Sequence, residues 1–150
     1  MMPHKTSFPK AATDNDARGL MALFTGVADR WQLSVEERCT LLGDVARSTH
    51  YEWTGKNPPK TLTTDQRTRI ALLVAIDLQL HAFYGLHSAN ARTHVRRTGT
   101  APSGHGTALA VMLAGPGYIG IEKVREHVEG LNGGSATITL SPEDWAQLAQ

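Results

Sequence analysis

The feature that most constrains the fold is the segment 65–84, in which apolar side chains recur every three or four positions. This spacing is the period of an α-helix with one buried face. Several N-capping side chains precede the segment, in Leu62-Thr63-Thr64-Asp65. The buried stripe comprises Ile70, Leu73, Val74, Asp77, Leu78 and His81. We therefore predict that this segment forms the longest helix of the protein.

Helical periodicity recurs through most of the remaining chain. One helix is predicted to begin at Asp14 or Asp16, and a second to begin at Ser34 and end at Gly43. Ser34 and Glu37 have the spacing of a capping box. Further helices are predicted at 45–53, 89–95, 107–114 and 119–131, with a loop at 98–106. The predicted fold class is therefore all-α.

The two ends of the chain are predicted to differ from this helical body. Residues 1–13 contain two prolines and few apolar side chains, so we expect a flexible arm there. The C-terminal tail, 135–150, has strand-like residues at Thr137–Leu140 and then a proline, Pro142, at the start of a final helical turn.

Composition indicates a folded protein with a modest core. The chain has 150 residues, of which 41% are hydrophobic and 19% charged. No run approaches the roughly 18 apolar residues that span a bilayer, and the first residues lack the apolar run of a signal peptide. We therefore expect a cytoplasmic protein without a membrane segment. The single cysteine, Cys39, cannot form an internal disulfide, and its expected role is packing.

Charge is divided unevenly along the sequence. Residues 1–100 hold 13 Lys or Arg against nine Asp or Glu, whereas residues 101–150 hold two against five. The first part thus has an excess of four positive charges and the second an excess of three negative charges. This division favours a protein whose first part meets a polyanion such as DNA.

Residues 34–53 match the pattern of a helix-turn-helix, in which the second helix enters the major groove. Cys39 is the small residue that lets the helices cross, and Gly43 precedes the turn. Val45 and Trp53 are predicted to face the core. The predicted DNA-binding residues are Arg47, Ser48, Thr49, Tyr51, Glu52, Lys56 and Lys60. Arginine and glutamate suit base edges, and hydroxyls and lysines suit phosphates.

A simpler alternative is a helical hairpin with a solvated polar face. Residues 31–60 hold four basic and four acidic residues, so this part of the chain has no local positive charge. The turn is also one residue longer than in the commonest helix-turn-helix. Pattern alone leaves both interpretations open.

Two regions of the chain resemble the Xre/MbcA/ParS family of antitoxins, which also tolerates the longer turn. The first region carries Trp31-Gln32-Leu33-Ser34, Leu41-Leu42-Gly43-Asp44-Val45 and Arg47-Ser48-Thr49, and the second carries His94-Val95-Arg96-Arg97, Thr107-Ala108-Leu109 and Met112-Leu113-Ala114-Gly115. The resemblance implies an Xre-like DNA-binding and dimerisation region at 14–88 that represses its own operon. It implies a toxin-binding region at 89–134 that covers the active site of an NAD-consuming RES-type toxin. A homodimer or a larger hetero-oligomer with the toxin is expected.

The expected toxin-binding residues are Arg96, Arg97, His105, Met112, Arg125 and Trp145. Trp145 is included because aromatic anchors dominate interface energies. The chain departs from the family pattern at His94, where Trp usually precedes the basic pair, and at Thr98-Gly99, where Pro-Asn usually follows it. These departures predict an altered toxin-contact surface.

Two other functions remain as alternatives. The first is a helix-turn-helix transcription regulator without a toxin partner, and a neighbouring toxin gene would distinguish the two. The second is a small enzyme, which is disfavoured because no paired acid and base or nucleophile stands out. Seven histidines show no ligand spacing, so we predict neither a metal nor a cofactor, and His81 is expected to be a half-buried core residue.

Overall fold

The computed structural model describes residues 16–133, so the predictions for the arm, the tail and Trp145 lie outside the described residues. Within this range the chain is helical, without a strand, which confirms the all-α prediction. The elements are α1 (Asp16–Arg30), α2 (Val35–Leu41), α3 (Arg47–Thr54), α4 (Thr64–Tyr84), α5 (Ala89–Thr93), the 3-10 helix η2 (His94–Arg96), α6 (Ala108–Leu113) and α7 (Ile119–Leu131).

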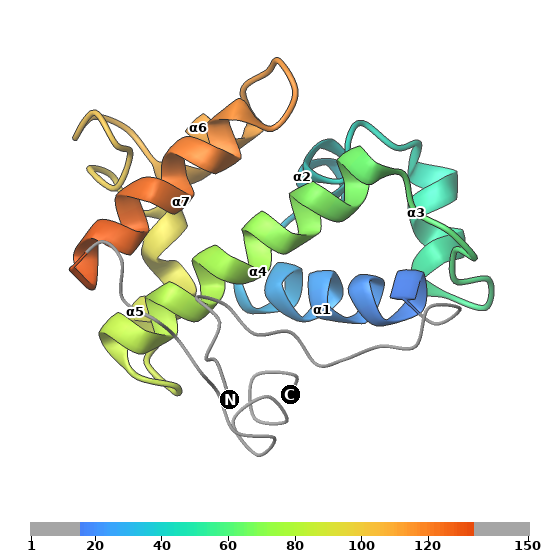
Figure 1. Cartoon of the computed structure of the whole chain (residues 1–150), viewed down its shortest axis with the longest axis horizontal. Coiled ribbons are helices and arrows are strands. Elements are labelled where there is room, and N and C mark those ends of the chain that lie inside the picture. Colours follow the sequence, from blue (N-terminus) through green and yellow to red (C-terminus); the bar gives the residue numbers. More distant parts are fainter. Residues whose placement is uncertain (1–15, 134–150) are drawn as a thin grey trace.

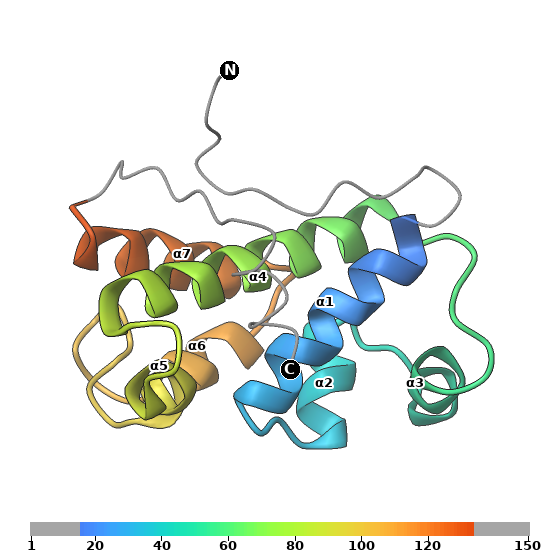
Figure 2. The same cartoon turned by 90° about the horizontal axis from the view of Figure 1, so that it is seen from below.

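The long helix α4 is the centre of the fold. α1 and α7 make its most extensive contacts, α7 and α5 lying toward its C-terminal end and α1, α2 and α3 toward its N-terminal end (Figures 1 and 2). All six residues of the predicted stripe are buried. The stripe was nevertheless too narrow a prediction, because Ala75, Ile76, Gln79 and Leu80 are buried as well. Since neighbouring helices cover more than one face of α4, its middle is enclosed, and His81 is fully buried at 2% exposure rather than half-buried.

The helix ends follow the capping side chains in the sequence. Ser34 and Glu37 form the predicted capping box of α2, and Thr63 forms another with Gln66 at the start of α4. Two boundaries at the turn between α2 and α3 differ from prediction. α2 ends at Leu41 and not at Gly43, and α3 begins at Arg47 and not at 45, because Gly43 and the residue after it have left-handed backbone angles that no helix accepts.

One hydrophobic core runs through both predicted regions. Phe24 of α1 and Leu73 of α4 belong to the same buried cluster as Leu109 of α6 and Ile121 of α7. α6 and α7 approach so closely that a Cβ added to Gly120 would lie 2.0 Å from the Val111 carbonyl oxygen. The boundary predicted between 88 and 89 is therefore not a break in the core.

A buried ion pair fastens the end of α1 to the middle of α4. Arg30 donates from Nε and Nη2 to Oδ2 of Asp77, at 3.0 and 2.7 Å, and the Trp31 indole donates to Oδ1 at 3.1 Å. His81 lies one turn further along α4, with Nδ1 2.7 Å from the Asp77 carbonyl oxygen. Because Arg30 and Asp77 are both buried, each needs the opposite charge of the other to offset the cost of its removal from water.

The buried Arg30–Asp77 ion pair and the exposed Arg38–Asp29 ion pair allow a matched comparison of their contributions to stability. Asp77→Asn leaves the Arg30 charge buried without its counter-ion, so we expect a loss of about 3–5 kcal/mol in the free energy of unfolding. Asp29→Asn removes the charge of a carboxylate that pairs with Arg38 and whose side chain is 63% exposed. For this variant we expect the free energy of unfolding to fall by less than about 1 kcal/mol. Urea denaturation measures both. Equal losses would contradict a structural role for the buried pair.

Candidate nucleic-acid and partner interfaces

The helices α2 and α3 are joined by a compact turn at 42–46. Gly43 and Asp44 have φ angles of 96° and 60°, and the Val45 amide donates to the Cys39 carbonyl at 3.2 Å. A Cβ added to Gly43 would lie 3.1 Å from Asp65 Oδ2 at the start of α4. The turn thus favours glycine both for its backbone angle and for the space around it. Cys39 is buried beside this turn, which confirms its packing role, and burial raises the pKa of its thiol.

Most predicted DNA-binding side chains are exposed. Arg47, Ser48 and Glu52 lie on the outer face of α3, and the Tyr51 side chain there is 54% exposed. Thr49 is only partly exposed. Lys56 and Lys60 follow the helix and are exposed as well. α3 lies at the opposite end of the molecule from α5, which leaves its outer face clear of the C-terminal half (Figures 1 and 2).

The inner face of α3 contains one residue that sequence reasoning missed. Val45 and Trp53 pack against the core as predicted, but the most deeply buried residue of α3 is His50, at 4% exposure. Neither of its ring nitrogens has a hydrogen-bond partner among the described residues. Burial, together with the positive charge of Arg38, lowers the pKa of His50, so the ring is neutral at pH 7.

Arg47 is already paired within the chain. Its Nη1 forms an ion pair with Oε1 of Glu36 on α2, and its Nη2 lies 3.5 Å from the Tyr51 hydroxyl. Hydrogen bonding to Tyr51 and the charge of Glu36 raise the pKa of Arg47, so the guanidinium is always charged. A hydrogen bond from its own backbone amide and the charge of Arg47 lower the pKa of Glu36. Glu36 therefore competes with any anion for this arginine.

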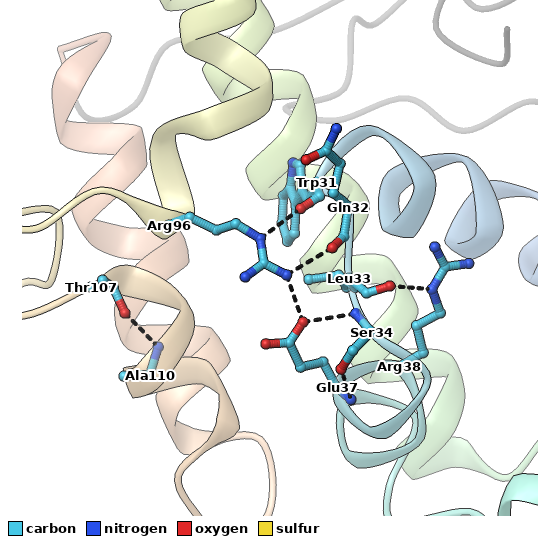
Figure 3. Close-up of polar contacts among 9 residues, drawn as sticks. All are labelled: Trp31, Gln32, Leu33, Ser34, Glu37, Arg38, Arg96, Thr107 and Ala110. Carbon is cyan, nitrogen blue, oxygen red and sulfur yellow. Dashed lines mark hydrogen bonds and ion pairs between the residues drawn. The ribbon is translucent and has the colours of Figure 1, made fainter.

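The predicted partner residues have different surroundings. Arg97 and His105 are exposed. Arg125 is partly buried and pairs with Glu129 at 2.8 Å on α7. Met112 is 2% exposed in the core, so it is a packing residue and not part of an accessible surface. Arg96 points toward the body of the protein, where it binds the segment between α1 and α2 (Figure 3).

A small cluster of Tyr84, His94 and Arg97 links the end of α4 to η2. Arg97 Nη2 donates to the Tyr84 hydroxyl at 2.9 Å, and that hydroxyl lies 2.9 Å from His94 Nδ1. Burial of the ring, followed by the positive charges of Arg97 and His127, lowers the pKa of His94 to about 4. The Tyr84 hydroxyl is therefore hydrogen-bonded to a neutral imidazole.

Two kinds of site are absent from residues 16–133. No three His, Cys, Asp or Glu side chains are grouped so as to hold a metal ion in this range. No helix there is both long enough and apolar enough to cross a membrane.

Comparison with known proteins gives one informative match. The chain is 30% identical over 132 residues to the uncharacterized protein y4oB of Sinorhizobium fredii, and the match covers 88% of this chain and 98% of that protein. The chain belongs to the y4oB family. Its similarity to y4oB extends across both the α2–α3 pair and the C-terminal half, since it covers nearly the whole length of each protein. No protein-family model matches the chain, and no solved structure matches it.

The His94 cluster predicts a pH dependence of stability. Since the folded-state pKa lies below the ordinary value of 6.5, the unfolded chain takes up a proton first as the pH falls. The contribution of His94 to stability is therefore fully present above pH 6.5 and is lost as the pH falls from 6.5 to about 4. We expect His94→Gln to reduce the loss between pH 7 and pH 5 by about 1 kcal/mol in urea denaturation. An unchanged pH profile in this variant would contradict a neutral, buried His94.

Proposed function

We propose that this protein is the cytoplasmic antitoxin of a type II toxin–antitoxin pair, which binds operator DNA through α2 and α3 and a RES-type toxin through its C-terminal half. The observation that supports DNA binding best is the division of α3 into two faces. His50 is buried on one side, while Arg47, Ser48 and Glu52 are exposed on the other, in a helix that follows a short helix and a glycine turn.

DNA recognition in this proposal follows from the exposed chemistry of α3. Arg47 at the first turn suits a guanine edge, Glu52 suits the amino group of cytosine, and the hydroxyls of Ser48 and Tyr51 suit phosphates. Lys56 and Lys60 add phosphate contacts just beyond the helix. A homodimer would present two copies of α3 to a palindromic operator.

Neutralisation in this proposal is occlusion and not catalysis. Arg97 and His105 are exposed in the half of the chain that resembles a toxin-binding region, whereas Met112 lies in the core. Covering the substrate cleft of an NAD-consuming toxin needs a complementary surface, and no cofactor or catalytic group on this chain. Repression and neutralisation then belong to one protein. The alternative, a regulator without a toxin partner, shares the DNA-binding half of the proposal.

Opposite effects of two variants on α2 and α3 test the DNA interface. Arg47→Ala removes a groove contact. At a salt concentration of about 150 mM, close to physiological ionic strength, we expect affinity for DNA upstream of this gene to fall by about tenfold or more. Glu36→Ala removes a competing carboxylate and a repelling charge, so affinity should rise. Arg92→Ala, which changes an exposed residue of α5 at the far end of the molecule, is the control. Fluorescence anisotropy reads all three, and unchanged affinity for Arg47→Ala would refute the interface.

Copurification with the product of the adjacent open reading frame tests the partner interface. We expect a stable complex, and we expect Arg97→Glu to weaken it by about tenfold because the charge of an exposed contact is reversed. Arg18→Glu makes the same charge change on an exposed residue of α1, outside the predicted toxin-binding region, and should have no effect. Absence of a complex with the wild-type chain would favour the regulator without a toxin.

A further inference from the structure

The side chain of Arg96 joins the C-terminal half of the chain to the start of α2. Its Nε donates to the Trp31 carbonyl at 2.9 Å, and its Nη2 donates to the Gln32 carbonyl at 2.8 Å. The same Nη2 lies 2.6 Å from Oε1 of Glu37. Figure 3 shows the guanidinium reaching from η2 across to this turn. One side chain therefore holds three acceptors that lie about 60 residues earlier in the sequence.

The amides of the turn that Arg96 holds bond back to α1, since Trp31, Gln32 and Leu33 donate to carbonyls of the last turn of that helix at 2.9, 3.1 and 2.9 Å, so what Arg96 supplies is partners for the carbonyls. Gln32 has a left-handed φ of 55°, which is uncommon for a residue other than glycine. The carbonyls at the end of a helix have no partner within the helix. Here three consecutive carbonyls, at 31, 32 and 33, accept from arginine side chains, the first two from Arg96 and the third from Arg38 at 2.9 Å.

Arg96 also binds the group that caps α2. Oε1 of Glu37 accepts the Ser34 amide at 2.8 Å in the capping box, and the same oxygen receives the Arg96 ion pair. The charge of Arg96 thus holds the capping carboxylate over the first turn of α2. α3 in turn packs on α2 and α1, so its position follows theirs.

On its other side, Arg96 is continuous with the predicted partner surface. Val95 before it is fully buried, whereas Arg96 itself and Arg97 after it are both exposed. η2 packs against α6, which also contacts α2. A shift of the backbone at 97–107 therefore reaches Arg96 directly.

We propose that Arg96 is a positioning residue for the α2–α3 pair, through which the C-terminal half of the chain sets DNA affinity. Its effect on DNA rests on the proposed function, whereas its hold on the start of α2 does not. Arg96 and Arg97 are both exposed, but the guanidinium of Arg96 is occupied by the turn before α2, so Arg97 is then the expected partner contact of the basic pair.

Amide hydrogen exchange on the intact chain tests the hold on α2. In Arg96→Ala we expect amides of Ser34 and of α2 to exchange about tenfold faster, while amides of 73–78 inside α4 keep the wild-type rate. Arg96→Lys keeps the charge for Glu37 but cannot bond all three acceptors, so it should recover part of the protection. Arg92→Ala is the matched control. Unchanged exchange in α2, or equal acceleration in α4, would overturn the positioning role.

Anisotropy with the DNA upstream of this gene tests the consequence for binding. We expect Arg96→Ala to bind about fivefold more weakly than wild type, with Arg92→Ala unchanged. Faster exchange in α2 with wild-type DNA affinity would overturn the link to DNA. If the wild-type chain does not bind this DNA, the proposed function fails, and exchange in α2 alone supports or overturns the hold that Arg96 exerts.

Discussion

The buried contact between Arg30, Trp31 and Asp77 is the interaction on which the remaining structure depends. It fixes the end of α1 against the middle of α4, the helix on which α7 also packs. The next few residues form the turn that leads to α2. Because that turn is held by Asp77 on one side and by Arg96 on the other, the α2–α3 pair is tied to the core at its first residues. The outer face of α3 is left exposed.

Much of the helical architecture is predictable because its signals are local. The apolar stripe of α4 and the capping box of Ser34 and Glu37 each depend only on residues close together in the sequence. The exposure of Arg47, Ser48, Tyr51 and Glu52 followed from the same spacing and is confirmed, while their binding to DNA stays a prediction. The sequence did not predict that α4 is enclosed on several faces, because apolar periodicity identifies one buried face and does not show how many helices pack around it.

The contacts that define the candidate site are less predictable because they join distant parts of the sequence. Arg30 and Asp77 are 47 residues apart, and Arg96 and Trp31 are 65 apart. Both arginines of the pair are exposed, and no local pattern shows that Arg96 binds the turn before α2 while Arg97 binds Tyr84. His50 was missed for a different reason. The two left-handed residues at 43 and 44 delay the start of α3, and this places His50 among the inward residues.

The proposed antitoxin role is tested most directly by growth of bacteria that express the adjacent open reading frame. The account predicts that this frame alone arrests growth and that co-expression of the chain restores it. Arg47→Ala should restore growth as well as wild type does, since its exposed position on α3 lies away from the C-terminal half, whereas Arg97→Glu should restore it poorly. An adjacent product that is harmless alone, or an arrest that this chain does not relieve, would contradict the account.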